Sequence, residues 1–383
     1  MNNPLEQREE AIKLHRELRG KIEMRSKRVI KDRTDLSLVY TPGVGAVSSL
    51  IAEQPEQADA LTWRKNAVAV ISDGSAVLGL GNIGPAAALP VMEGKCAIFK
   101  EFAGIDAVPL VLGTQDPEEI IRIAVALAPS FGALQFEDIS APRCFEIERR
   151  VQEALDIPLM HDDQHGTAIV ALAALLNATK VVGKNLKDCR VVLNGAGAAG
   201  TAIAKLLRVA GVQQKNLIAV DRTGAIFAGR GELNVEKQLL ADVTNEERVS
   251  GSLFDVAKGA DILIGISVAG AFSVEVVKAM AKDPIVIALA NPVPEILPDV
   301  AKEAGVAVLA TGRSDFANQV NNALCYPGLF RGMLDQGVKK VTDEIKLRAA
   351  HAIASMIETP TADRIIPTMF NEGLVETVAK SVV

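Results

Sequence analysis

One glycine-rich loop restricts the fold of this chain more than any other feature. The loop Gly195-Ala-Gly-Ala-Ala-Gly200 follows the β-type run Arg190–Leu193. The helical segment Thr201–Ala210 comes next, and a second β-type run, Leu217–Val220, ends at Asp221. In a strand–loop–helix–strand unit of this kind, glycines let the backbone approach a pyrophosphate, and the helix N-terminus offers free N–H groups. The segment therefore predicts a dinucleotide site.

The residues expected to contact the cofactor are the loop and the acidic end of the following strand. They are Gly195, Gly197, Ala198, Ala199, Gly200, Asp221 and Arg222. A carboxylate at the position of Asp221 accepts hydrogen bonds from the ribose hydroxyls and repels a 2′-phosphate, which favours NAD. The adjacent Arg222 weakens that preference, so NAD is predicted and NADP stays open.

A second loop has the same glycine spacing, with Gly79, Gly81 and Gly84. The next β-type run, Cys96–Phe99, is not followed directly by an acid, because Lys100 comes first. From the residues alone this loop is either a weaker nucleotide site or a tight turn that brings backbone close to another group.

Short β-type runs alternate with helical stretches along the chain, which predicts an α/β fold with mostly parallel sheets. The runs are Ala67–Ile71, Cys96–Phe99, Val108–Leu112, Ala133–Phe136 and Ile157–Met160, then Arg190–Leu193, Leu217–Val220, Ile262–Ile264, Pro284–Leu289 and Val306–Leu309. A long apolar helix is expected from Gly166 to about Val182, and Asp116-Pro117 is typical of a helix start.

We expect two α/β domains, the second a Rossmann-type doubly wound parallel sheet, with helical N- and C-terminal segments. Residues 1–160 are predicted to form a substrate and catalytic domain, and residues 161–340 the dinucleotide-binding domain. Residues 341–383 are predicted to form helices that pack back on the first domain, and Leu5–Arg19 reads as a polar helix.

Two acidic pairs follow β-type runs. Glu137-Asp138 comes directly after one run, and Asp162-Asp163 comes after another with only His161 between. Ligands of open α/β sheets bind at the carboxyl ends of strands. Converging carboxylates without nearby cysteine predict a hard cation, Mg²⁺ or Mn²⁺. For His161 and His165 the favoured interpretation is that they orient the loop.

Composition excludes several classes of protein. The net charge of −6 gives no reason to expect nucleic acid. The four cysteines are too widely spaced for a zinc site or a disulfide framework, the start does not resemble a signal peptide, and the longest apolar run, Ala168–Leu176, is too short to span a membrane. We therefore expect a cytoplasmic protein. One basic stretch, Arg16–Arg33, is either a solvated face, a subunit contact or a field that attracts an anionic substrate.

Eight segments in order resemble the malic enzyme family, in particular its short microbial branch. They are Ser37–Val44, Asp73–Gly84, Glu93–Lys95, Phe136–Asp138, His161–Thr167, Asn194–Gly200, Ala290–Pro292 and Asn321–Asn322. The resemblance implies oxidative decarboxylation of L-malate to pyruvate and CO₂ with reduction of NAD(P)⁺ and a divalent cation. It also assigns the first glycine loop to the substrate domain.

The resemblance implies a role for each matching residue. Lys95 matches the general base, Tyr40 the general acid, Asp162 a supporting acid, Glu137, Asp138 and Asp163 the metal ligands, and Asn291 and Asn322 the residues that contact substrate, with Asn291 also near the cofactor. A lysine beside a dication and partly desolvated is expected to have a lowered pKa. Lys100 remains a competitor for Lys95.

One departure from the family concerns the substrate carboxylate. Larger members hold it with an arginine just before the first glycine loop, where this chain has Ala76 and Val77. The Asn residues, the backbone amides of residues 75–84 and Arg313 stay open as replacements. The resemblance also implies a homodimer, and whether Tyr40 serves its own site or a partner's stays open.

Two other functions remain as alternatives. Some relatives are metal-dependent oxaloacetate decarboxylases that make no net use of NAD, although the loop at Gly195 and Asp221 argue against this here. A non-catalytic nucleotide-binding module would lack the lysine, tyrosine and carboxylate set that this chain carries.

Overall fold

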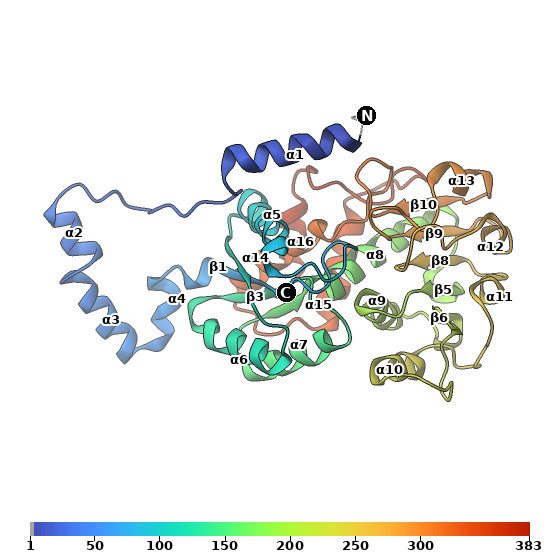
Figure 1. Cartoon of the computed structure of the whole chain (residues 1–383), viewed down its shortest axis with the longest axis horizontal. Coiled ribbons are helices and arrows are strands. Elements are labelled where there is room, and N and C mark those ends of the chain that lie inside the picture. The colour runs from blue at the N-terminus through green and yellow to red at the C-terminus, as the bar shows by residue number, and fades with distance from the viewer. Residues whose placement is uncertain (1–3) are drawn as a thin grey trace.

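Two parallel sheets form the body of the protein, whose computed structural model describes residues 4–383 (Figure 1). The first sheet has the strand order β2-β1-β3-β4, and the second has the order β10-β9-β8-β5-β6-β7. The strands are β1 (Ala67–Ser72), β2 (Asp106–Val111), β3 (Ala133–Phe136), β4 (Leu159–His161), β5 (Val191–Asn194), β6 (Leu217–Asp221), β7 (Gly224–Ala225), β8 (Ile262–Gly265), β9 (Ile285–Ala288) and β10 (Val308–Thr311). Only the short β7 pairs antiparallel, with β6. The predicted α/β fold with a Rossmann-type sheet is confirmed.

Helices cover both faces of each sheet. The helices of the body are α5 (Pro85–Ala103), α6 (Pro117–Leu127), α7 (Arg143–Ala154), α8 (Asp162–Val181), α9 (Ala198–Val209), α10 (Val235–Val243), α11 (Leu253–Ala257), α12 (Val274–Lys278), α13 (Pro298–Glu303), α14 (Tyr326–Gln336), α15 (Asp343–Ser355) and α16 (Leu374–Lys380). In β1, Ala69 and Ile71 pack toward α6 and α7, whereas Val68 and Val70 pack toward α5. The strand is buried on both faces, as parallel strands usually are.

Helix α8 joins the two halves of the core. It starts directly after β4 of the first sheet and packs on α9 and α15. Its residues from Ala168 to Leu175 are all buried, so the helix is apolar around its whole circumference. At the C-terminal end, α15 packs against α8, and α14 against α5. The division of the chain near residue 160 stays a prediction.

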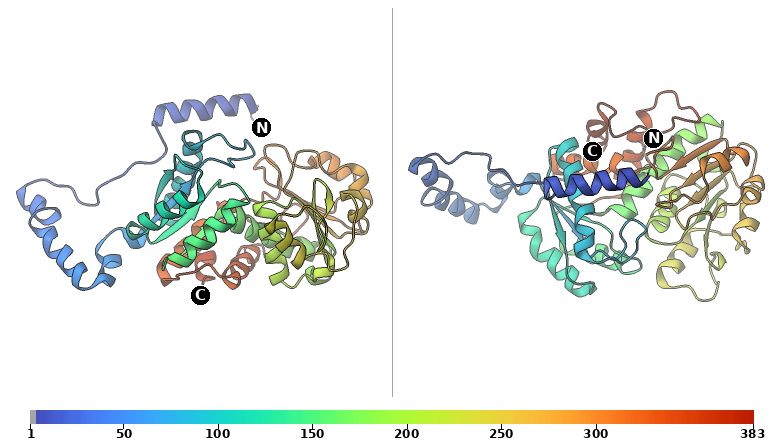
Figure 2. Two further views of the ribbon diagram at one scale, coloured as in Figure 1. Left: turned by 60° about the horizontal axis from the view of Figure 1, so that its bottom comes forward. Right: turned by 45° about the horizontal axis from the view of Figure 1, so that its top comes forward.

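An N-terminal arm stands away from the body. It contains α1 (Pro4–Leu18), α2 (Arg33–Val39), α3 (Gly43–Glu53) and α4 (Ala58–Leu61). Helices α2 and α3 project beyond the first sheet in three views (Figures 1 and 2), and neither contains a buried residue. The stretch Arg33–Glu53 has the length and hydropathy of a membrane span. It is nevertheless two helices, because the chain leaves the helix between Tyr40 and Pro42.

Most predicted elements are confirmed within two residues, and one is wrong. Asp116 caps α6, accepting a hydrogen bond from Glu119 N, as its sequence indicates. The β-type run Cys96–Phe99 lies inside α5 instead of forming a strand. The reason is spacing: the buried residues of α5 are Ala88, Met92, Cys96 and Phe99, three or four apart. That helical period outweighs the local β preference of four residues.

Candidate active site

A cavity of about 710 Å³ lies where the carboxyl ends of the two sheets face each other. The first sheet contributes Glu137 and Asp138 after β3, and Asp163 after β4. The second contributes Ile266 after β8 and Asn291 after β9. Other residues that line the cavity include Lys21, Gly79, Gly94, Lys95, Ala199, Asn322 and Tyr326. Both sheets therefore place ligand-binding groups at the edge where α/β proteins bind ligands.

Lys95 is the central side chain of the cavity. Its Nζ lies 2.6 Å from Asp162 Oδ2 and 2.9 Å from Glu137 Oε1. Helix α5 places it there because it turns its buried face, including Cys96, onto β1 and β2. The competitor Lys100 lies on the outer face of the same helix and pairs with Asp106 at 2.7 Å. The geometry therefore separates the two lysines: only Lys95 lines the cavity.

The neighbouring carboxylates determine the pKa of Lys95 in the chain without a bound cation. Burial alone lowers the pKa of this lysine, but the carboxylates of Asp162 and Glu137 outweigh burial and raise it well above its usual value. In the protein chain by itself, Lys95 is therefore an ammonium ion held by two carboxylates. The expected lowering of the pKa presupposes a cation on these carboxylates, so it stays a prediction.

The three predicted metal ligands line the cavity, and two of them have unsatisfied oxygens. Glu137 Oε2 and Asp138 Oδ2 are enclosed and accept no hydrogen bond. Burial, then repulsion from Asp163, raises the pKa of Asp138 to about 8, and burial raises that of Glu137 well above its usual range. Asp138 also has a left-handed backbone, with φ of 54°, a rare conformation that often marks a functional site.

These features fit a hard cation, which would satisfy the oxygens and keep the carboxylates ionised. Within residues 4–383, however, no group of three or more His, Cys, Asp or Glu side chains is arranged as a ready-made metal site. Asp163 explains part of this, because its Oδ2 accepts a hydrogen bond from the backbone N of Asp138 at 2.7 Å.

Glu148 on α7 holds the junction of β4 and α8 behind the carboxylates, and no sequence pattern indicated this role. It accepts hydrogen bonds from the backbone N of His161 at 2.8 Å, from Gln164 at 3.0 Å and from His165 Nε2 at 3.1 Å. Burial opposes ionisation, but these partners prevail and lower the pKa of Glu148 to about 2. His165 thus ties α8 to α7, although it lies in a helix and not in the predicted loop.

The first glycine loop meets the second sheet at the cavity. Gly79 has φ of 78°, and a Cβ added to it would lie 2.5 Å from the carbonyl oxygen of Asn291. Any side chain at this position would therefore push the two apart. The loop is a close backbone contact beside Asn291, which is the second of the two interpretations that the residues allowed.

The second glycine loop connects β5 to α9 as predicted. Helix α9 begins at Ala198, with Gly197 as its N-cap residue. A Cβ on Gly200 would lie 1.9 Å from the carbonyl oxygen of Gly195, so only glycine permits this turn. The N-terminus of α9 opens toward the cavity through Ala199. This geometry suits a pyrophosphate.

Asp221 ends β6 as predicted, but its carboxylate is already engaged. Arg230 binds it with two hydrogen bonds of 3.0 and 2.6 Å, and Lys237 with one of 2.7 Å. Thr223 donates two more. These bonds overcome the effect of burial and lower the pKa of Asp221. A ribose hydroxyl must therefore displace or join these partners, which the sequence did not indicate.

Comparison with known proteins identifies the family. The family model for the malic enzyme N-terminal domain matches residues 19–152, and the model for the malic enzyme NAD binding domain matches residues 164–382. The chain belongs to the malic enzyme family. It is 57% identical to the NAD-dependent malic enzyme of Geobacillus stearothermophilus, over 95% of this chain and 76% of that protein. It is 50% identical to the bifunctional malic/malolactic enzyme of Bacillus subtilis, over 98% of this chain and 92% of that protein.

Solved malic enzymes share the fold. The crystal structure of the NAD-dependent malic enzyme of Thermotoga maritima superposes with a TM-score of 0.94 at 48% identity, covering 97% of this chain and 98% of that one. The prediction of the family from eight short segments is confirmed.

Tyr40, the matching tyrosine of this malic enzyme, is not brought into the cavity by its own chain. It caps the C-terminal end of α2 in the projecting arm and is 65% exposed. The tyrosine that does line the cavity is Tyr326, at the start of α14. Its ring centroid lies 4.8 Å from Lys95 Nζ, and its hydroxyl is enclosed without a hydrogen bond. No motif in the sequence singled out Tyr326.

Arg313 does not replace the arginine that larger malic enzymes place before the first glycine loop. Its guanidinium binds Asp315 through two hydrogen bonds of 2.8 and 2.7 Å, and it also donates to the carbonyl oxygen of Pro292. It is not among the residues that line the cavity. Asn291 and Asn322 do line it.

Proposed function

We propose that this protein catalyses the oxidative decarboxylation of L-malate to pyruvate and CO₂ with reduction of NAD(P)⁺. The observation that carries the proposal is the position of Lys95. It projects into the cavity between Glu137 and Asp162, and the N-terminus of α9 opens onto the same cavity. A proton acceptor, a carboxylate cluster and a dinucleotide loop thus share one enclosed space, as hydride transfer from a hydroxy acid requires.

The carboxylates of Glu137, Asp138 and Asp163 are the proposed ligands of Mg²⁺ or Mn²⁺. When bound, such an ion would polarise the C2 oxygen of the substrate and neutralise charge that now raises the pKa of Lys95. The enclosed, unsatisfied oxygens of Glu137 and Asp138 support this assignment.

The chain's own residues divide the remaining work. Lys95 removes the proton from the C2 hydroxyl as C2 passes a hydride to the nicotinamide, and Asp162 holds the lysine in position. Asn291 and Asn322 donate hydrogen bonds to the substrate. The C3–C4 bond then breaks, CO₂ leaves, and Tyr40 protonates C3 of the resulting enol to give pyruvate.

We also propose a homodimer in which the arm of each subunit delivers Tyr40 to its partner. Large apolar side chains of the arm are exposed, including Leu36, Leu38, Val39 and Val44. Several large apolar side chains exposed within one short segment support a subunit contact there. The same contact would account for the apolar stretch Arg33–Glu53 without a membrane. We place the protein in the cytoplasm, with no nucleic acid partner.

Complementation between two inactive subunits tests the exchange. Tyr40→Phe and Lys95→Ala chains carrying different affinity tags are co-expressed, and dimers with both tags are purified. If Tyr40 acts on the partner, one of the two sites is intact, and turnover per dimer is about half that of the wild type. If Tyr40 acts within its own chain, the mixed dimer is as inactive as its parents, and the proposed exchange is wrong.

The reaction itself is tested with malate, Mn²⁺ and either NAD⁺ or NADP⁺. We expect reduced cofactor and pyruvate in equal amounts, measured by absorbance and by product analysis. Consumption of oxaloacetate without any NADH from malate would instead identify a decarboxylase that makes no net use of NAD. Initial rates with the two cofactors side by side also establish the preference between NAD⁺ and NADP⁺. We expect Asp221 to favour NAD⁺.

A further inference from the structure

Positive charge is scarce in the cavity, although its proposed substrate carries two carboxylates. The residues that line it include Glu137, Asp138 and Asp163, with Asp162 directly behind Lys95. Among the lining residues the structure describes, only Lys95 and Lys21 are cationic. Lys95 is already held by two carboxylates. A divalent cation offsets only part of this negative charge, so the second carboxylate of a dianion needs another partner.

Lys21 lies at the base of the arm, on the cavity side of α5. Its backbone N donates to Glu93 Oε2 at 3.1 Å, and its Nζ donates to the carbonyl oxygen of Pro90 at 2.7 Å. A Cβ on Gly94 would lie 3.4 Å from the same Nζ. The ammonium therefore rests on the glycine that directly precedes Lys95. Lys21, from the segment after α1, thus lies against the part of α5 that carries Lys95.

Lys21 keeps donors available for a ligand. An ammonium ion has three N–H donors, and the structure commits one of them to a carbonyl oxygen. Glu93 holds the backbone of Lys21 and favours its charged form, while burial works against that charge and lowers the pKa of Lys21. The group is thus partly desolvated, which strengthens any charged hydrogen bond it makes.

We propose that Lys21 is a specificity-determining residue that binds the substrate carboxylate remote from the reacting C2 hydroxyl. The proposal rests on the proposed malate oxidation and extends it. It identifies a substitute for the arginine that larger members place before the first glycine loop. Arg313 cannot serve, because Asp315 occupies its guanidinium. Asn291 and Asn322 orient a carboxylate but bring no charge to balance it.

The contrasting explanation is that Lys21 only anchors the arm to α5. Both roles use the same contacts with Pro90 and Glu93, so loss of activity alone does not distinguish them. A carboxylate partner acts on dicarboxylates in particular, whereas an anchor acts on subunit assembly and on every substrate equally. The test therefore compares substrates and measures the dimer.

The experiment uses Lys21→Met and Lys21→Arg in the full chain, with Lys13→Met as the control. Lys13 lies on the same arm, and its side chain is 77% exposed. We expect Lys21→Met to raise the KM for malate about 10- to 100-fold, the usual effect of one charge-assisted hydrogen bond. The kcat and the KM for NAD⁺ should change little, and Lys21→Arg should recover part of the loss.

The C4 monomethyl ester of malate sharpens the test, because its remote carboxyl group is neutral. The ester cannot release CO₂, so only the oxidation step is compared, as the KM measured from NADH formation. The wild type should have a lower KM for malate than for the ester, and Lys21→Met should bring the two KM values together, with the dimer intact in sedimentation. A malate KM within about twofold of the wild type overturns the proposal. So does an equal loss for malate and ester, or dissociation of the dimer. If the wild type oxidises no malate at all, the proposed function fails first, and that result is distinct from all of these.

Discussion

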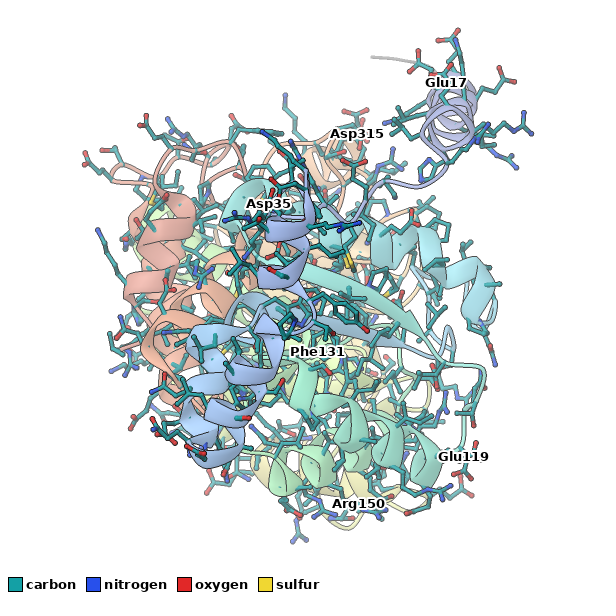
Figure 3. All side chains as sticks on the ribbon, turned by 90° about the vertical axis from the view of Figure 1, so that its left-hand side faces the viewer. Glu17, Asp35, Glu119, Phe131, Arg150 and Asp315 are labelled. Atoms are coloured by element: carbon teal, nitrogen blue, oxygen red, sulfur yellow. The ribbon has the colours of Figure 1, made fainter. Side chains whose placement is uncertain are left out.

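Tyr40 and Tyr326, the two tyrosines of the sequence, lie in regions that differ in almost every physical respect. Tyr326 is fully buried and lies over Lys95 inside a continuous core. Tyr40 belongs to an arm whose helices α2 and α3 bury no residue (Figure 3, where the arm with Asp35 faces the viewer). The apolar side chains of the body pack against one another, whereas the arm leaves apolar side chains exposed to water, which is unfavourable.

The contrast supports the proposed exchange of the arm between two subunits. The body supplies a cavity, a base and a dinucleotide loop, and its contacts are internal. After α4 the chain meets the body through Trp63, whose ring lies 6.0 Å from that of Phe131. Beyond that point α2 and α3 pack mainly on each other and on the following turn. Substitutions in the body and in the arm separate the contributions of these two regions to catalysis.

The largest expected effect lies in the body, at Lys95. We predict that Lys95→Ala lowers turnover by at least ~10²-fold, the usual scale for an acid–base group. Lys100→Ala is the matched control, since this lysine lies on the outer face of the same helix with Asp106. Its turnover should stay within about twofold of the wild type, because exposed ion pairs contribute little. The measurement is steady-state kinetics with malate, and equal losses in both variants would move the base away from Lys95.

The second prediction compares the two tyrosines directly. Tyr40→Phe should lower kcat by about 10²-fold, because it removes the proton donor to C3. Tyr326→Phe should change kcat by less than about threefold. The enclosed Tyr326 hydroxyl makes no hydrogen bond, and burial raises its pKa further from any catalytic range. Addition of the proton to C3 is followed in deuterated water. A larger loss at Tyr326 than at Tyr40 would assign the acid to the body and make the arm dispensable.

The sequence predicted the body well because each of its features is local. The strand at Arg190–Leu193, the loop at Gly195 and the cap at Asp116 all depend on residues that are neighbours in the chain. The acidic pairs could be placed at strand ends before their contacts were known. The prediction of a strand at Cys96–Phe99 was wrong, because a run of four residues is too short for its hydrophobic periodicity to distinguish a strand from a buried helix.

Features that depend on distant residues were not predictable. Glu148 meets His161 and His165 only because β4 and α7 are adjacent in the fold. Arg230 and Lys237 reach Asp221 across turns that leave no pattern in the sequence. The projection of Tyr40 away from the cavity was equally unpredictable, since local residue patterns do not show how the arm lies relative to the body. A sequence shows residue types and local hydrophobic periodicity. These three features depend instead on which distant segments lie next to each other in the folded chain.

The third prediction concerns the stability of the body at low pH. The pKa of Glu148 is about 2 in the folded protein and about 4.3 in an unfolded chain. Its stabilising contribution is therefore complete above about pH 4.3 and disappears as the pH falls through 2. Glu148→Gln should lower the free energy of unfolding at pH 7 by about 2 kcal/mol and flatten its fall between about pH 4.3 and 2.

Urea unfolding over that pH range measures this effect. The control is Glu153→Gln on the same helix, where the glutamate is 61% exposed and paired with Arg149. It should leave the curve unchanged. Parallel curves for the wild type and Glu148→Gln would show that the carboxylate does not couple the loop to folding.

The smallest effect is expected at the far end of the body, where Lys237 and Arg230 bind Asp221. Asp221→Ala frees both cations, so kcat/KM for NADP⁺ should rise relative to NAD⁺ by about 10-fold. Lys237→Met should act in the opposite direction, by about threefold, because it removes a cation near the 2′-position and leaves Asp221 more accessible to a ribose hydroxyl. Lys258→Met, at an exposed pair with Asp255, is the control. Opposite shifts would show that the charge balance around Asp221 determines cofactor choice. An unchanged ratio in both variants would mean that the ribose binds elsewhere, and that Asp221 serves only to hold Arg230 and Lys237 in place.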